Sequence, residues 1–395
     1  MEKLWKYKKI GEVCIVERGA SPRPIDKYIT DNESGINWIK IGDTSDSMYI
    51  TETAQKIIVE GMKKSRYVKP GDFLLSNSMS FGRPYILKID GCIHDGWLVL
   101  RDENALFDKR FLYYYLSSKT TYKKLKSMAV GGVVNNLNSE MVRNVIVPVP
   151  DKEEQSEIAD LFDKIKKILD DRKQELEQLD TLVKSRFVEL FGDPIKNPKG
   201  WEVVKLSECL ERIDNGKSFT CDSNAREGVF PAILKLSAAT YGDYRPYENK
   251  ALLDEKQFVE SVEVHRGDLL FTRKNTPDLV GMAAYVFETP EKLMMPDLIF
   301  RLVTNERMTP TFLWQLINNR EFRPAIQGIS GGSAKSMSNI SKERLKNIEV
   351  ICPPISEQKK LEGVLEQVDK LKSKIQKSLE ETQLLFDSLM QKYFG

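Results

Sequence analysis

Two long stretches of the chain place an apolar residue at every third or fourth position. The first runs from Lys152 to Leu190 and the second from Ser356 to Phe394, and neither contains a proline. Spacings of three and four that persist over about five heptads are typical of a coiled-coil seam. At about 1.5 Å per residue, each stretch predicts a helix roughly 55 Å long. Such a helix cannot bury its apolar stripe alone, so we expect the two helices to pair.

The segment in front of each predicted helix has the pattern of mixed α/β structure. Short apolar runs bounded by turn residues predict strands, at 36–41, 73–76 and 97–100 in the first segment and at 234–236, 269–271 and 298–300 in the second. Helical patterns follow at 109–125 and 311–326, and a proline-containing strand closes each segment at 145–150 and 348–353. The pattern therefore predicts an α+β globular domain before each long helix.

The chain contains one pattern twice. Trp5 opens the first copy and Trp201 opens the second, 196 positions later. The other matched pairs, in chain order, are Gly71-Asp72 with Gly267-Asp268, Gly131-Gly132 with Gly331-Gly332, Pro150…Glu154-Gln155 with Pro353…Glu357-Gln358, and Phe191-Gly192 with Phe394-Gly395. An ordered series of matches indicates a tandem duplication of about 200 residues.

The connections between the parts predict how the long helices pair. The first helix leads from one globular segment to the next, and the second helix begins where the second segment ends. A pair formed by them should be antiparallel, with a pseudo-two-fold internal duplication. We therefore expect two mixed α/β domains joined by two long antiparallel coiled-coil helices, with boundaries at 1–150 (first domain), 151–192 (central helix), 193–352 (second domain) and 353–395 (C-terminal helix).

Composition and charge narrow the class of protein. The 395 residues are 41% hydrophobic and 30% charged, which is typical of a soluble globular protein and excludes a mostly disordered one. No apolar run approaches the roughly 20 residues that a membrane helix needs. Five scattered cysteines favour free buried thiols in a reducing cytoplasm, and two histidines argue against a structural zinc site. The net charge of +2 does not by itself point to nucleic acid, although residues 1–150 carry 23 basic against 17 acidic side chains.

Motifs for catalysis are missing from the sequence. The run 214–218, Asp-Asn-Gly-Lys-Ser, ends like a phosphate-binding loop, but the first glycine of that motif would fall at Glu211. His94 precedes Asp95, but the second copy has no matching histidine, which favours a core or surface role for His94. The chain therefore reads as a binding protein, with no catalytic residues, no metal site and no cofactor of its own.

Polar and basic residues at three kinds of loop are candidates for contacts with whatever the chain binds. Hydroxyl, amide and cationic side chains of these types bind base edges and phosphates. They are Ser76, Asn77, Ser78 and Arg83 with Thr272, Arg273, Lys274 and Asn275 after the Gly-Asp turns, Asn135 and Asn136 with Lys335 and Ser336 after the Gly-Gly loops, and Arg18 and Arg23 in a proline-rich loop. Each kind of loop has a plainer reading as well, as a polar hairpin tip, a simple turn or a solvated loop.

The order of these motifs resembles the specificity subunit of type I restriction–modification systems. The resemblance rests on the two Trp-x-x-x-Lys openings, the Gly-Asp turns, the Gly-Gly loops, the Pro-x-x-x-Glu-Gln junctions and the Phe-Gly helix ends, and it covers essentially the whole chain.

The resemblance implies a function that the composition does not. Each globular segment would be a target-recognition domain that reads one half of an asymmetric, split sequence in double-stranded DNA. The paired helices would set the gap between the halves and dock two modification (methyltransferase) subunits, which carry S-adenosylmethionine. Restriction (motor–nuclease) subunits would join this cytoplasmic complex.

Two other functions stay open on the residues alone. A two-headed adaptor or spacer that binds proteins would have the same duplicated layout. An enzyme with an unrecognised site, such as a self-contained methyltransferase, would have to bind S-adenosylmethionine by itself.

Overall fold

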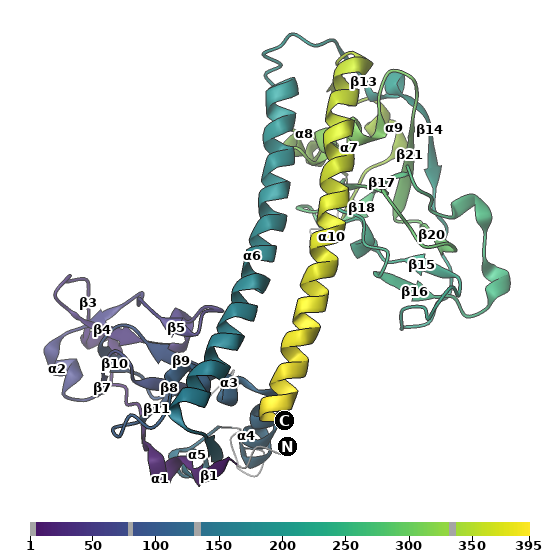
Figure 1. The fold of residues 1–395 in the computed structure, drawn as a ribbon. Helices are drawn as coiled ribbons and strands as arrows, with labels where there is room; N and C mark the ends of the chain where they lie inside the picture. The colour runs from purple at the N-terminus through teal and green to yellow at the C-terminus, as the bar shows by residue number, and fades with distance from the viewer. Residues whose placement is uncertain (1–4, 78–81, 130–135, 332–336) are drawn as a thin grey trace. The chain divides into compact units, whose positions relative to one another are not determined.

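The computed structural model describes residues 5–77, 82–129, 136–331 and 337–395, which form two compact units (Figure 1). Unit 1 comprises residues 1–172 together with 378–395, and unit 2 comprises residues 173–377. Each long helix is divided between the two units. The sequence-based boundaries at 150, 192 and 352 stay a prediction.

The two predicted long helices are α6 (Lys152–Phe191) and α10 (Ile355–Phe394), each of 40 residues. In unit 1 the start of α6 packs against the end of α10, where the ring of Phe162 lies 5.4 Å from Phe386 and 5.7 Å from Phe394. In unit 2 the end of α6 packs against the start of α10, and Lys372 forms an ion pair with Asp180. Each unit therefore holds the start of one long helix against the end of the other, so the helices are antiparallel, as predicted.

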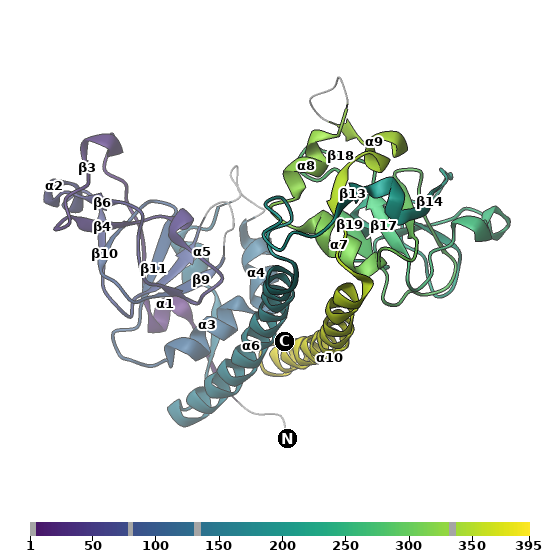
Figure 2. The same cartoon turned by 90° about the horizontal axis from the view of Figure 1, so that it is seen from above.

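Among the residues that the structure describes, unit 1 forms two five-stranded sheets and a two-stranded ladder (Figure 2). The first sheet has the order β2 (Ile15–Arg18), β11 (Trp97–Arg101), β8 (Phe73–Ser76), β9 (Pro84–Leu87) and β5 (Tyr49–Ile50). The second has the order β3 (Ile29–Thr30), β6 (Lys56–Ile57), β4 (Ile36–Ile39), β10 (Gly91–Ile93) and β7 (Arg66–Val68), and the ladder pairs β1 (Lys6–Lys9) with β12 (Ile146–Val149). The helices are α1 (Ile10–Val13), α2 (Val59–Met62), α3 (Lys109–Ser117), α4 (Lys119–Ala129) and α5 (Ser139–Arg143), with 3-10 turns η1 (Ile25–Lys27) and η2 (Ile41–Asp43).

The described residues of unit 2 repeat this plan with fewer strands. Its main sheet has the order β14 (Leu210–Asn215), β21 (Ile299–Thr304), β17 (Leu269–Thr272) and β19 (Ala283–Tyr285), and the second sheet has the order β16 (Asn249–Ala251), β15 (Ala232–Leu234) and β20 (Leu293–Met294). Two ladders pair β13 (Val203–Lys205) with β23 (Glu349–Ile351) and β18 (Lys274–Asn275) with β22 (Ser338–Asn339). The helices are α7 (Pro310–Asn318), which packs on β17 and β19, α8 (Arg323–Gly328) and α9 (Lys342–Lys346), and the 3-10 turns are η3 (Leu206–Cys209), η4 (Leu236–Ala238), η5 (Glu255–Gln257) and η6 (Glu260–Val262).

A buried glutamine joins α6 to the globular part of unit 1. Gln155 lies in the first turn of α6 and its side chain is fully buried. Its amide nitrogen donates to the carbonyl oxygens of Leu106 (3.1 Å) and Pro150 (2.9 Å), and its amide oxygen accepts from the backbone N–H of Asp108 at 2.7 Å. These bonds satisfy backbone groups that would otherwise be buried without partners. The Glu-Gln motif of the sequence is therefore a structural clamp.

The second copy repeats this clamp. Gln358, also fully buried, donates to the carbonyl oxygens of Arg307 (2.9 Å) and Pro353 (2.7 Å), and accepts from the N–H of Thr309 at 2.8 Å. We name the two sets of bonds the glutamine clamps.

The phenylalanine of each Phe-Gly motif packs at the end of its long helix on a buried aromatic ring. Phe394, at the end of α10, packs in unit 1 on Phe111 with ring centroids 5.5 Å apart. Phe191, at the end of α6, packs in unit 2 on Phe312 with centroids 4.8 Å apart. All four rings are buried. Each long helix thus begins on the globular part that precedes it and ends on the other one.

The two Gly-Asp motifs make the same tight turn. Gly71 and Gly267 have φ angles of 89° and 93°, a region that residues with a Cβ rarely adopt. The carboxylates of Asp72 and Asp268 accept from the backbone N–H three residues earlier, at 2.9 and 2.8 Å. Each turn leads directly into a buried strand, β8 or β17.

All five cysteines are free thiols. Four are buried and Cys221 is half-buried. Burial raises the pKa of Cys14 to about 12 and that of Cys92 to about 11, so neither is a thiolate at neutral pH. Among the described helices, not one combines the length and the apolar character required to cross a membrane.

We expect Gln155→Ala and Gln358→Ala each to lower the free energy of unfolding by about 2–4 kcal/mol. Each change leaves one backbone N–H and two carbonyl groups buried without partners. Thermal and urea unfolding would measure the loss. The exposed neighbours Glu153→Ala and Lys359→Ala are matched controls that should change little. Glutamine variants as stable as these controls would contradict the clamp.

Candidate nucleic-acid interface

The residue that follows β8 in unit 1 and the residue that follows β17 in unit 2 make the same pattern of backbone hydrogen bonds. We call this pattern the frame. Asn77 donates its N–H to Gly96 (2.9 Å) and accepts from the N–H of Leu137 (3.0 Å). Arg273 donates its N–H to Leu298 (3.0 Å) and accepts from the N–H of Ile340 (2.8 Å). The two bonds thus tie the strand end to the neighbouring turn and to the segment after the Gly-Gly loop. The backbone is the same in both units, while the side chains differ.

A glycine after the neighbouring edge strand extends this frame. Gly19 donates its N–H to Trp97 (2.9 Å), and a Cβ on Gly19 would lie 2.1 Å from the carbonyl oxygen of His94. A Cβ on Gly216 would lie 2.0 Å from the carbonyl oxygen of Pro296. Both loops therefore approach the neighbouring turn too closely for any side chain at this position.

In unit 1, residues from two of the candidate loops form hydrogen bonds with Asp95. The Asp95 carboxylate accepts from Ser21 Oγ at 2.8 Å and lies 3.4 Å from Arg23 Nη2. Its carbonyl oxygen accepts from Arg18 Nε (3.1 Å) and from Asn77 Nδ2 (2.8 Å). The structure therefore brings Arg18, Arg23 and Asn77 together on one residue that the sequence did not single out.

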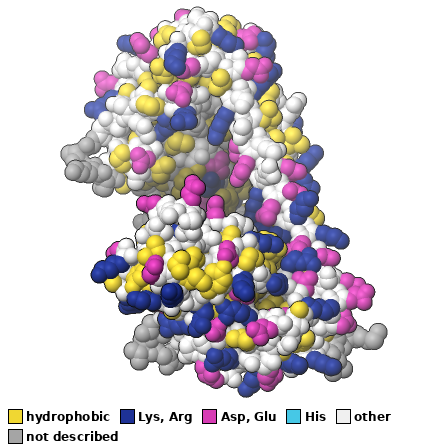
Figure 3. All heavy atoms as spheres, turned by 90° about the vertical axis from the view of Figure 1, so that its left-hand side faces the viewer, with side chains coloured by type: hydrophobic (Ala, Val, Ile, Leu, Met, Phe, Trp, Pro, Cys, Tyr) yellow, Lys and Arg dark blue, Asp and Glu magenta, His cyan; other side chains and the backbone are white. Residues whose placement is uncertain are grey.

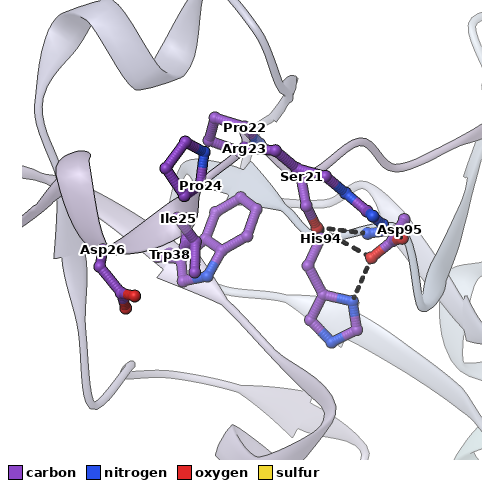
Figure 4. A pocket seen from close by; sticks show the side chains of 9 residues that line it. All are labelled: Ser21, Pro22, Arg23, Pro24, Ile25, Asp26, Trp38, His94 and Asp95. Atoms are coloured by element: carbon purple, nitrogen blue, oxygen red, sulfur yellow. Dashed lines mark hydrogen bonds and ion pairs between the residues drawn. The ribbon is translucent and has the colours of Figure 1, made fainter.

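An open pocket of about 680 Å³ lies beside this turn (Figure 4). Its lining residues come from the proline-rich loop, from β4 and from the Asp95 turn, and are Ser21, Pro22, Arg23, Pro24, Ile25, Asp26, Trp38, His94 and Asp95. The His94 ring is half-buried, and its Nδ1 lies 2.6 Å from the N–H of Gly96, from which it accepts. Burial lowers the pKa of His94, although the nearby Asp95 acts in the opposite direction. His94 is therefore neutral at physiological pH and helps to shape the turn.

The other candidates of unit 1 differ in exposure. Ser76 and Asn77 are each 1% exposed, and their side-chain bonds are made within the chain. Arg83 is exposed and lies 3.8 Å from the Asp46 carboxylate, and Asn136 is half-buried. In the free chain, Arg83 is the more accessible of these side chains, and Ser76 and Asn77 support the frame.

In unit 2 the candidates lie at the β18–β22 ladder. Thr272 and Asn275 are buried, and Lys274 is exposed. The guanidinium of Arg273 stacks on the ring of Phe300, 4.9 Å from its centroid, and its Nε lies 3.4 Å from the Asn339 side chain. Stacking on an aromatic ring and a single hydrogen bond hold the guanidinium in place while leaving further donors available. Ser78, Asn135, Lys335 and Ser336 lie outside the described residues.

The surface of unit 1 combines apolar and basic side chains. In Figure 3, which views the molecule from the side where α2 and β3 lie in Figure 1, hydrophobic side chains gather among lysine and arginine side chains. In the same unit, Lys64 Nζ lies 5.0 Å from the centroid of the Tyr28 ring. Within the part of the chain that the structure describes, no group of three or more His, Cys, Asp and Glu side chains could hold a metal ion.

The family model for the type I restriction modification DNA specificity domain matches residues 2–179 and again residues 198–381. The chain belongs to this family. The two matches also confirm the duplication predicted from the sequence.

Curated relatives and solved structures agree with this membership. The EcoEI specificity subunit of Escherichia coli is 32% identical over 204 residues, which are 50% of this chain and 34% of that protein. The MjaVIII specificity subunit of Methanocaldococcus jannaschii is 22% identical over 93% of this chain and 86% of its own length. The S subunit structure from M. genitalium has the same fold, with a TM-score of 0.60 at 14% identity, and the match covers 100% of this chain and 97% of that one. These relatives are specificity subunits of type I restriction enzymes, and the solved structure shares the fold of this chain.

We expect Gly19→Ala and Gly216→Ala to destabilise their units by about 1–3 kcal/mol, because a Cβ would overlap a backbone carbonyl oxygen. Thermal unfolding of each variant would show the loss. Gly42→Ala in unit 1 and Gly363→Ala in α10 are matched controls, since a Cβ there meets nothing within 4 Å. Equal stability of all four variants would show that the close approach is not required.

Proposed function

We propose that this chain is the DNA-recognition subunit of a type I restriction–modification complex, in which each unit reads one half of a split, asymmetric site. The observation that carries the proposal is the shared frame with different side chains. Asn77 and Arg273 occupy equivalent positions, held by equivalent backbone bonds. A common frame supports a common mode of docking, and different side chains support different half-sites.

The arginine at the frame of unit 2 suits the reading of base edges. Arginine pairs with guanine through two hydrogen bonds. Arg273 is half-buried and oriented by Phe300 and Asn339, which suits a base-reading role. Exposed Arg18, Arg23, Arg83 and Lys274 are suited to phosphate contacts, which position the protein without reading sequence.

The paired helices would act as the ruler between the half-sites. Each helix of 40 residues is about 60 Å long. Half-sites read from one side of a duplex lie about 34–36 Å apart, or one helical turn. The duplicated sequence gives the chain two related recognition units, which suits a site made of two half-sites.

The same helices offer a surface for partner subunits. Exposed apolar side chains project from α6 and α10, at Ile168, Leu182, Val188, Leu371, Leu384 and Leu385, with exposed fractions of 45–73%. We propose that two methyltransferase subunits, which would carry S-adenosylmethionine, dock along this coiled coil and that restriction subunits join them. One structure with the same fold, at a TM-score of 0.58, comes from work on the assembly of the type I restriction–modification system.

Mapping of methylated adenines in cells that express this chain with its methyltransferase partner tests the function. The expected result is one asymmetric sequence in two short halves, separated by a gap of constant length. Methylation at a continuous site, or none that depends on this chain, would contradict it.

We expect Arg273→Ala to relax specificity at one position of one half-site by about 1–3 kcal/mol. Competition binding by the assembled complex, with duplexes that carry single base changes, would measure this loss. The other half-site should be read as before. Arg212→Ala, whose side chain is 55% exposed in the same unit, is the matched control. Uniform weakening on every duplex would instead assign Arg273 to a phosphate.

A further inference from the structure

A loop at residues 215–218 of unit 2 occupies the place of the Arg18–Arg23 loop of unit 1. Arg18 lies opposite Leu98 at the end of the β2–β11 ladder, and Asn215 lies opposite Phe300 at the end of the β14–β21 ladder. Each is followed by the glycine that touches the neighbouring turn. The equivalence therefore rests on strand register and close packing together.

The backbone bonds beyond the glycine agree as well. Ala20 donates its N–H to Ile93 (3.2 Å), and Lys217 donates its N–H to Met295 (3.0 Å). The turn that receives these bonds contains Asp95 in unit 1 and Asp297 in unit 2. The backbone of the two loops thus follows the same path, and the loops differ in their side chains.

The charge and exposure of the loop distinguish it from an ordinary turn. Asn215, Lys217 and Ser218 are all exposed. In the described part of unit 2, the Lys217 ammonium has no ion pair or hydrogen bond, while Asp297 is itself exposed. In unit 1, by contrast, Arg23 is held by Asp95. Lys217 therefore keeps a charge that is available for an external anion.

The loop also adjoins the candidate interface of unit 2. Phe300, the ladder partner of Asn215, carries the guanidinium of Arg273 on its ring, with Lys342 Nζ 5.6 Å from the same centroid. Lys342 donates to the carbonyl oxygen of Ile213, two residues before Asn215. Lys217, Arg273 and Lys342 therefore lie near the same end of the β14–β21 ladder.

We propose that Lys217, with Asn215 and Ser218 beside it, binds the phosphate backbone of the DNA half-site read by unit 2. The loop is no nucleotide-binding loop, because β14 is followed by a long irregular segment and then by β15, and not by the helix that such a motif requires. A compact ammonium suits a phosphate oxygen, and hydroxyl and amide groups supply further hydrogen bonds. This inference rests on the proposed function of the chain.

Lys217→Ala in the complex with the methyltransferase partner tests the proposal. We expect binding to weaken about 3–10-fold on every duplex, with the slope of log K against log salt reduced by about 0.9, because one phosphate contact is lost. Lys217→Arg should retain most of the affinity. Lys205→Ala, an exposed lysine on β13 of the same unit, is the matched control.

The outcomes separate this inference from the proposed function. A wild-type complex that does not bind its DNA would overturn the function itself. If the wild type binds and Lys217→Ala binds equally well with the same salt slope, the loop proposal is wrong. A fall in the melting temperature of Lys217→Ala relative to Lys205→Ala, with an unchanged salt slope, would also overturn it, because the lysine would then be structural.

Discussion

The buried glutamine at the start of each long helix is the interaction on which the rest of the structure depends. Gln155 and Gln358 each satisfy three buried backbone groups at the point where a globular part becomes a helix. A buried amide with all its bonds made allows one orientation, since any other leaves polar groups unpaired. The direction of each long helix is thereby set by its own globular part, and the aromatic packing of Phe394 and Phe191 sets where each helix ends.

Specificity depends on the positions that the shared backbone of the two units leaves free to vary. The turns at Gly71 and Gly267 and the close approaches at Gly19 and Gly216 repeat in both units, because backbone geometry demands them. The side chains on the shared backbone, such as buried Asn77 in unit 1 and half-buried Arg273 in unit 2, are not bound by that demand. A subunit that reads two different half-sites needs this combination. The shared backbone positions each unit on the DNA, and the differing side chains determine which bases it reads.

Much of the fold was predictable because its signals are local and occur twice. The heptad spacing predicts both long helices, and the order of connections predicts their antiparallel pairing.

The site was less predictable, since the exposure of a side chain depends on tertiary packing. Ser76 and Asn77 read as polar tip residues, yet both are buried. Asp95 joins its own turn to two loops distant in sequence, the one at Arg18–Arg23 and the one at Asn77, which no local pattern reveals. The run 214–218 lacks the first glycine of a phosphate-binding loop, and only alignment of Asn215-Gly216 with Arg18-Gly19 through the repeat indicates its place.

The equivalence of the two frames can be tested by making the units identical. In a chain whose Trp201–Pro353 segment is replaced by a second copy of Trp5–Pro150, the glutamine clamps and the Phe111-type contacts would be present in both units. Methylation mapping of cells that carry this chain with its partner is the decisive measurement. The account predicts a site made of two identical half-sequences in inverted orientation, with the gap of the parent site. A well-folded chain that still directs methylation to the parent asymmetric site, or to halves in direct orientation, would contradict it.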